Sequence, residues 1–189
     1  DLLKMPMIAI VGSRQASANG LRNAAVFAHQ LARSGGLIVS GLARGIDGVA
    51  HRATASMNGK HFTAAVCGTG LDTVYPKEHF DLANKIGRQG LLISELGPGI
   101  GPKPFHFPRR NRIIAALALG VVVIEAAENS GSLITARIAA DLGREVFALP
   151  GPAHDPRYAG CHQLIQQGAK LVCKPHEVLE ELIFHKNRI

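Results

Sequence analysis

"IAIVGSRQAS", residues 8–17, joins a short apolar run to a glycine-containing turn and then to a helical pattern. An apolar run of this kind is typical of a buried strand, and a strand that leads through a turn into a helix is the opening unit of a parallel α/β sheet. Turns at this position often bind anions, because a helix N-terminus presents free N–H groups and the positive end of its dipole. The stretch therefore predicts an α/β fold and a candidate anion site.

The same alternation of apolar runs and helical patterns continues along the chain. Helical periodicity is clearest in Ala24, Phe27, Ala28 and Leu31, which share one face of a helix. Strand-helix alternation implies right-handed crossovers. We expect a doubly wound, mostly parallel sheet with helices on both faces, an extended Rossmann-like fold, in one domain over residues 1–189. The strands are expected near 7–12, 37–41, 62–67, 91–95, 120–125, 145–149 and 169–173.

The turn after the first strand departs from the dinucleotide fingerprint. The second and third glycines of G-x-G-x-x-G are missing, and residues 2–46 contain no acid that could bind a ribose. We therefore expect no NAD and no other cofactor. Gly12, Ser13 and Arg14 form either a phosphate contact or a tight turn with a surface arginine.

The net charge of +7 is concentrated in two segments. Residues 1–46 hold five Lys/Arg and one acid (+4), and residues 96–124 hold four Lys/Arg and no acid (+4). Residues 47–95 hold five of each, whereas residues 125–189 hold seven Lys/Arg and eight acids (−1). This distribution is either a solvated basic face or a polyanion site built from two loops.

Ligands of doubly wound sheets bind beyond the carboxyl ends of the strands. Three arginines in "FPRRNR", 107–112, are expected just after Pro108 in the first turns of a helix, where unpaired positive charge is unfavourable unless an anion binds. Asp47 is interpreted as a structural carboxylate at a helix start. Ser130 or Ser132 is either a phosphate contact or a helix N-cap. The candidate phosphate contacts beyond the first turn are Ser40, Gly41, Arg44, Lys77, Arg109, Arg110, Asn111, Arg112, Ser130, Gly131 and Ser132.

Several function classes find no support in the sequence. No nucleophile-base-acid set, paired catalytic carboxylates or metal-ligand spacing is present, so we expect no catalytic residues and no metal. The longest apolar run, 113–124, is too short to span a bilayer. Three cysteines without a C-x-x-C pair suggest buried thiols in the cytoplasm. Aromatic content of 5% argues against extensive base stacking, so Phe105 and Phe107 either flank bases or, as we expect, pack in the core.

A set of strings, in order along nearly the whole chain, resembles the DNA-processing protein A (DprA/Smf) family. The resemblance implies a Rossmann core that binds single-stranded DNA in a basic pocket. It also implies protection of incoming strands during natural transformation, loading of the recombinase RecA, and a homodimer. The strings are "VGSR", "SGLARGIDGVAHRAT", "GTGLDTVYP", "SELGPG", "FPRRNRIIAALA", "ENSGSLITARIAADLGREVFALPG" and "GCHQLIQQGAKLV".

The resemblance also assigns roles to residues. It implies that Gly12, Ser13 and Arg14 contact phosphate and that Arg44, Lys77 and residues 109–112 line the pocket. "GCHQLIQQGAKLV", 160–172, is either the association segment, with His162, Ile165 and Leu171 on the dimer face, or an ordinary helix and core strand. Many members carry an N-terminal helical domain and a C-terminal winged helix. We expect this chain to be the Rossmann core without them.

A different class of function competes with DNA binding. Lysine-decarboxylase-like phosphoribohydrolases use similar sheets and a P-G-G-x-G-T-x-x-E loop at a helix start. The comparable stretch here is "ENSGSLITA", residues 128–136; Glu125 lies upstream of this stretch, and no acid follows its glycine before Asp141. The general acid/base of such an enzyme is therefore absent from its usual place, and we expect a non-catalytic protein.

Overall fold

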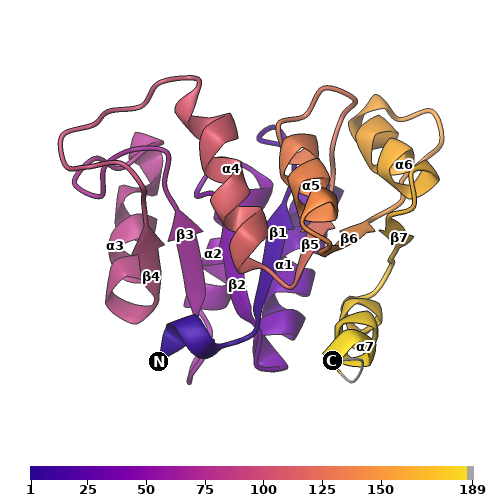
Figure 1. Cartoon of the computed structure of the whole chain (residues 1–189), viewed down its shortest axis with the longest axis horizontal. Coiled ribbons are helices and arrows are strands. Elements are labelled where there is room, and N and C mark those ends of the chain that lie inside the picture. The colour runs from indigo at the N-terminus through magenta and orange to yellow at the C-terminus, as the bar shows by residue number, and fades with distance from the viewer. Residues whose placement is uncertain (187–189) are drawn as a thin grey trace.

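A computed structural model describes residues 1–186 as an α/β structure built on one sheet of seven parallel strands (Figure 1). The strand order is β4-β3-β2-β1-β5-β6-β7. Strands β1 to β4 therefore extend the sheet in one direction, and the chain then crosses back to place β5 on the other side of β1, from where β6 and β7 extend the sheet in the opposite direction. The predicted doubly wound fold is confirmed. The strands are β1 Met7–Val11, β2 Leu37–Ser40, β3 Thr63–Val66, β4 Leu91–Ile93, β5 Gly120–Val123, β6 Glu145–Ala148 and β7 Lys170–Leu171.

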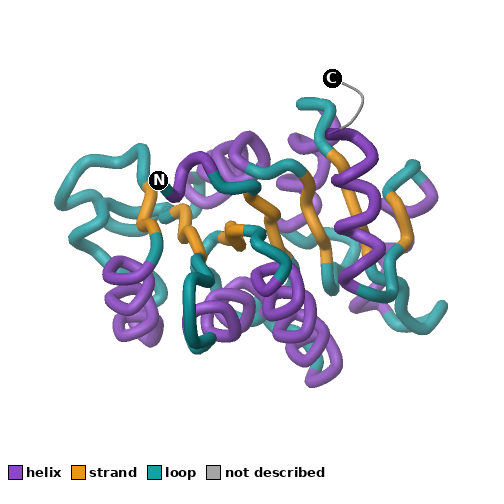
Figure 2. Tube along the Cα trace, turned by 90° about the horizontal axis from the view of Figure 1, so that it is seen from below, coloured by secondary structure: helices purple, strands orange, loops and turns teal. Residues whose placement is uncertain are grey.

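Helices cover both faces of the sheet, as the end-on view of the strands in Figure 2 shows. Helices α1, α2, α3 and α7 pack on one face, and α4, α5 and α6 pack on the other. Their bounds are α1 Ala18–Arg33, α2 Ile46–Ala55, α3 Phe80–Gln89, α4 His106–Leu117, α5 Ser132–Asp141, α6 Ala159–Gln166 and α7 Pro175–Lys186. Short 3₁₀ helices are η1 Leu2–Lys4, η2 Lys77–His79 and η3 Pro156–Tyr158.

The two faces of each central strand bury different apolar sets. Along β1, Ile8 and Ile10 pack with α1 and α2, whereas Ala9 and Val11 pack with α4 and α5. Every residue of β1 is buried, which is why the strand reads as a continuous apolar run rather than an alternating one. The predicted face of α1, with Ala24, Phe27, Ala28 and Leu31, lies in this core.

All seven strands lie where the sequence predicts them, and each is shorter than predicted by one to three residues. Two helix starts differ from expectation. α1 begins at Ala18, with Ser17 as its N-cap, and not directly after Arg14. α4 begins at His106, so Pro108 lies inside its first turn and not before it. Cys161 is buried, but Cys67 is half-buried and Cys173 is exposed, so the expectation of three buried thiols is wrong.

The point where the strand order reverses lies between β1 and β5. The chain leaves β1 toward α1 on one face, and it leaves β5 toward α5 on the other. The two connections diverge and leave a crevice at the carboxyl ends of these strands, which is where ligands of open α/β sheets bind. Residues 12–17 follow β1 and residues 124–132 follow β5, so these two segments are where the fold predicts a ligand site.

Candidate nucleic-acid interface

Two neighbouring hollows lie at the carboxyl edge of the sheet. The first, here called the switch groove, has a volume of about 700 Å³ and is lined by residues 12–15 and 127–132 together with Pro156 and Ala159. The second, here called the arginine pocket, has a volume of about 150 Å³. Its lining residues are Arg14, Gln15, Gly41, Ala43, Arg44, Tyr75, Pro76, Phe107 and Arg110. Arg14 and Gln15 line both hollows and therefore form the ridge between them.

The turn at Gly12 and Ser13 is fixed by its own backbone. The Ser13 N–H donates to the Glu125 carbonyl oxygen at 2.7 Å, and the Ser13 carbonyl accepts from the Ile46 N–H at 3.2 Å. A Cβ at Gly12 would lie 2.7 Å from the Ile46 side chain, and one at Gly45, whose φ is +70°, would lie 2.2 Å from the Ser13 oxygen. Because the Ser13 amide is already bonded, it is not the free phosphate donor that the sequence suggested. The turn instead holds Arg14 in a defined position.

Arg14 projects from this turn as an exposed side chain. Its guanidinium carbon lies 5.5 Å from the centroid of the Phe107 ring, a cation–π distance. Among the ion pairs between described residues, none involves Arg14. A cation without a carboxylate partner, on the ridge between two hollows, is available to an anion.

Two aromatic rings form one wall of the arginine pocket. Tyr75 and Phe107 have ring centroids 5.3 Å apart, and Phe107 also lies 5.9 Å from the Arg110 guanidinium. A Cβ at Gly68 would lie 2.8 Å from Phe107, so glycine at that position leaves room for the ring. The prediction of core positions is wrong for Phe105, which is 60% exposed. Phe107 is half-buried as a pocket wall. A base-flanking role was one of the two predicted for Phe107, whereas the sequence did not identify Tyr75.

The floor of the pocket is a buried polar cluster. Arg110 is only 4% exposed and donates through its Nη1 to the carbonyl oxygens of Gly41, at 2.6 Å, and Val66. Asp47, buried in the first turn of α2, accepts from the Gly41 N–H at 3.0 Å, which confirms its structural interpretation. Burial raises the pKa of Asp47 against the opposing effect of Arg110, and burial lowers the pKa of Arg110.

These contacts correct two residue roles. Arg110 lines the pocket, but its guanidinium is held inside the protein, because it donates hydrogen bonds to two backbone carbonyl groups there. Ser40 is fully buried, and its hydroxyl donates to the Ile10 carbonyl at 2.6 Å. Both residues shape the site from below, unlike the direct phosphate contacts that the sequence suggested.

Apart from Arg14, the exposed arginines around the pocket are paired with carboxylates. Arg44 makes a two-pronged contact with Glu78, with Nη2 to Oε2 at 3.1 Å, and this contact raises the pKa of Arg44 and lowers the pKa of Glu78 to about 2. Arg109 and Arg112 both contact Glu95, the former at 3.5 Å. Lys77 is exposed at the start of η2, next to Glu78. The positive charge at the rim is thus partly neutralised by Glu78 and Glu95.

The far wall of the switch groove is the N-terminus of α5. Its N-cap is Gly131 and not a serine, and no acid lies in its first turn. The Ser130 and Ser132 hydroxyls bond each other at 2.7 Å, and Ser130 Oγ accepts from the Ser132 N–H at a long 3.4 Å. Asn111 donates to the Gly131 carbonyl at 3.3 Å and so connects α4 to this loop. This helix end therefore offers hydroxyls and a positive dipole end to the groove.

The predicted association segment forms α6 and β7. His162 is half-buried, and its Nε2 lies 3.2 Å from the Gly151 nitrogen and 3.1 Å from the Gly151 oxygen. Ile165 packs partly buried against the core, and Leu171, on the edge strand β7, is 48% exposed. Of the three candidates, Leu171 is the most exposed to solvent.

The model of the DNA recombination-mediator protein A family matches residues 1–183. The chain belongs to this family. Protein Smf of Escherichia coli is 52% identical over 94% of the chain, and DNA processing protein DprA of Streptococcus pneumoniae is 51% identical over 97%. These alignments cover 47% and 64% of the two relatives, so the chain spans between about half and two thirds of their length.

Solved structures agree with this assignment to the DNA recombination-mediator protein A family. The crystal structure of the Streptococcus pneumoniae protein superposes with a TM-score of 0.88, at 49% identity, over 96% of this chain and 63% of that one. DNA processing protein A from Helicobacter pylori gives a TM-score of 0.87 at 28% identity, over 97% and 83%. That Helicobacter structure was described for its single-stranded DNA binding mode. Among the described residues of this chain, no helix has the length and apolar character needed to cross a membrane.

Proposed function

We propose that this chain binds single-stranded DNA along the carboxyl edge of its sheet, with Arg14 as the central contact. The observation that carries the proposal is the position of Arg14, an exposed arginine without an ion-pair partner among the described residues, shared by the switch groove and the arginine pocket. Family membership and the DNA binding mode of the Helicobacter relative support the same conclusion.

Phosphates of the strand lie in the switch groove. They are bound by Arg14 from one side and by the α5 N-terminus, with Ser130 and Ser132, from the other. A neighbouring base enters the arginine pocket against Tyr75 and Phe107. A base can enter such a pocket only when it is unpaired, which favours single strands over duplex. Arg44, Lys77, Arg109 and Arg112 extend the positive rim.

The Arg14→Ala variant tests this arrangement. Fluorescence anisotropy with labelled oligo-dT at several salt concentrations should show weaker binding and a salt slope shallower by about 0.7, the value for one lost single-strand phosphate contact. Arg33→Ala is the matched control, because Arg33 is an exposed arginine in the last turn of α1. Equal binding by Arg14→Ala and the parent chain at low salt would refute the proposal.

The chain acts as a recombination mediator that shields incoming strands and passes them to RecA during natural transformation in the cytoplasm. Non-specific phosphate binding suits this role, because most readout is of the backbone and not of sequence. The supporting facts are the family match and the relatives named above. The test is protection of oligo-dT from a single-strand nuclease, followed by RecA filament formation on the protected strand, each lost in Arg14→Ala.

Two copies associate through α6 and β7. Leu171 supports this proposal because it is a large apolar side chain, 48% exposed, on the edge strand of the sheet. Leu171→Asp should convert a dimer to a monomer in light scattering. Leu142→Asp, at a 51% exposed leucine beyond α5, is the control and should leave the mass unchanged.

The chain performs this role without catalysis. Glu125, the acid nearest to a hydrolase position, is fully buried, and its carboxylate accepts from the Ser17 N–H at 2.9 Å and from the Ser17 hydroxyl. The carboxylate in the switch groove is Glu128, which is exposed. Incubation with nucleoside monophosphates should release no free base. Base release that disappears in Glu128→Gln would establish the hydrolase alternative.

A further inference from the structure

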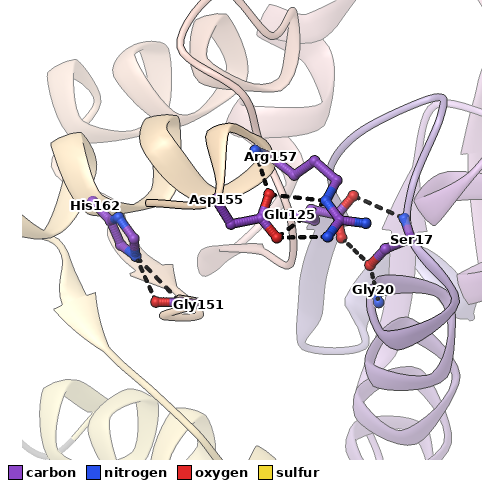
Figure 3. A network of polar contacts seen from close by, with 7 residues as sticks. All are labelled: Ser17, Gly20, Glu125, Gly151, Asp155, Arg157 and His162. Atoms are coloured by element: carbon purple, nitrogen blue, oxygen red, sulfur yellow. Dashed lines mark hydrogen bonds and ion pairs between the residues drawn. The ribbon is translucent and has the colours of Figure 1, made fainter. Parts of the chain in front are cut away.

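The N-terminus of α1 is occupied by a carboxylate of the protein itself, that of Glu125. Glu125 follows β5, and its side chain extends to the first turn of α1, as Figure 3 shows. Its Oε1 accepts from the Ser17 N–H at 2.9 Å, and its Oε2 accepts from the Ser17 hydroxyl at 2.5 Å. The Ser17 hydroxyl in turn accepts from the Gly20 N–H at 3.0 Å. The carboxylate thus bonds to the donors that begin the helix.

The packing around this carboxylate leaves no room for a second anion. Glu125 is fully buried, and a Cβ at Gly20 would lie 2.6 Å from its Oε2. Glycine at position 20 is therefore required by the carboxylate itself, which lies directly against the helix. In other strand-turn-helix units this is the position that binds a ligand's phosphate.

Tyr158, Arg157 and the backbone of Ser13 lie around Glu125. Burial raises the pKa of Tyr158, and the neighbouring Ser17 and Glu125 side chains have smaller effects on it. Arg157 lies beside the cluster in Figure 3, held mainly by Asp155, with Nη2 to Oδ2 at 2.6 Å. The Glu125 carbonyl also accepts from the Ser13 N–H. One residue therefore holds both the start of α1 and the turn that carries Arg14.

We propose that Glu125 is a specificity-determining residue that fills the phosphate position of α1 and so excludes the diphosphate of a nucleotide or dinucleotide. A diphosphate at this helix would have to share the Ser17 donors with a buried carboxylate of like charge. The N-terminus of α5, which has no acid in its first turn, remains for the phosphodiester. The exclusion rests on the geometry of α1 alone, whereas its consequence for DNA rests on the function proposed above.

Glu125→Ala tests the proposal because it removes the carboxylate from the N-terminus of α1. Thermal unfolding is followed at constant ionic strength while sodium formate replaces sodium chloride, and then with inorganic pyrophosphate. We expect the variant to melt below the parent chain and to regain on the order of 3 °C at formate concentrations about tenfold above the dissociation constant. Pyrophosphate should also raise the midpoint of the variant, and neither anion should do so for the parent. An identical response of variant and parent to both anions would overturn the proposal.

Glu125→Gln decides the question if the alanine variant does not fold. Glutamine keeps the volume and an acceptor for Ser17 but removes the charge. We expect a lower midpoint than that of the parent chain, because a neutral amide interacts more weakly with the helix dipole and with the Ser17 hydroxyl. A midpoint equal to or above that of the parent would show that the helix does not require an anion there. Because no DNA is present, failure here and failure of the Arg14 experiment remain distinct.

Discussion

The guanidinium of Arg14 lies 5.5 Å from the ring centroid of Phe107, although the two residues are 93 positions apart in the sequence (107 − 14). Arg14 comes from the turn after β1, and Phe107 comes from the first turn of α4. The contact joins the switch groove to the aromatic wall of the arginine pocket. Charge for a phosphate and a surface for a base therefore lie side by side.

Phe107→Leu separates the stacking contribution from the electrostatic one. Leucine keeps apolar volume in the pocket wall but removes the ring. We expect oligo-dT affinity to fall by between about fivefold and about 150-fold, because base stacking on an aromatic side chain contributes about 1–3 kcal/mol. The salt slope should stay unchanged, since no phosphate contact is lost. Phe80→Leu, at a 58% exposed ring on α3, is the control. A shallower slope with unaltered affinity would argue against a base in the pocket.

Glu95→Gln releases the arginines at the rim. Glu95 contacts both Arg109 and Arg112, and it lowers the positive potential available to a phosphate. We expect the variant to bind oligo-dT more tightly, with a steeper dependence on salt as freed arginines contact phosphates. Titrations of both proteins at two salt concentrations measure the effect. Weaker binding would show that Glu95 positions the arginines for DNA and does not compete with it.

Arg110→Met tests whether the buried arginine is structural. The change leaves Asp47 buried without its compensating charge and leaves the Gly41 and Val66 carbonyls without a donor. Leaving a buried charge uncompensated in this way typically costs about 3–5 kcal/mol of unfolding free energy, which urea denaturation measures. Arg112→Met, at an exposed position of the same helix, should change stability by less than about 0.5 kcal/mol. Full stability of Arg110→Met together with lost DNA binding would reverse the assignment.

His51 should make the fold sensitive to acid. Its Nδ1 lies 2.7 Å from Thr63 Oγ1, whose hydrogen goes to the Ile38 carbonyl, so we assign the neutral ring its proton on Nδ1. Among the described residues the buried Nε2 has no hydrogen-bond partner, and burial, with smaller effects of His79 and Arg110, lowers the pKa of His51 to about 3.

Because the unfolded chain binds this proton near pH 6.5 and the folded chain only near pH 3, stability decreases as pH falls from 6.5 toward 3. Between pH 7.5 and 5.5 this histidine should account for a loss of about 1.4 kcal/mol in unfolding free energy. Urea denaturation at both pH values measures the loss, and His51→Gln should show a correspondingly smaller one. An equal loss in both proteins would show that His51 does not carry the effect.

The fold was predictable because its signals are local. Runs such as 120–125 are apolar on both faces of the strand, and this pattern specifies a covered parallel strand without knowledge of its neighbours. The basic residues at the carboxyl edge were predictable for a related reason, since strand ends in such sheets meet at one edge.

The details of the site depend on long-range contacts that leave no local signal. Arg110 and Arg112 are both arginines in one short run, and only the packing of α4 against β2 and β3 buries the first and exposes the second. Tyr75, from a loop, and Phe107, from the first turn of α4, meet to form the aromatic wall. The carboxylate of Glu125 reaches Ser17 across 108 positions, so the true start of α1 could not be predicted from residues 8–17 alone.

The central claim is that the carboxyl edge of this sheet binds single-stranded DNA through phosphates and one or more unpaired bases. The most direct test measures the affinity of the chain for oligo-dT and for a duplex of equal length across a range of salt concentrations. The account predicts tighter binding of the single strand at every salt concentration, with both affinities falling as salt rises. Equal affinity for the two at all salt concentrations, or preference for the duplex, would contradict it.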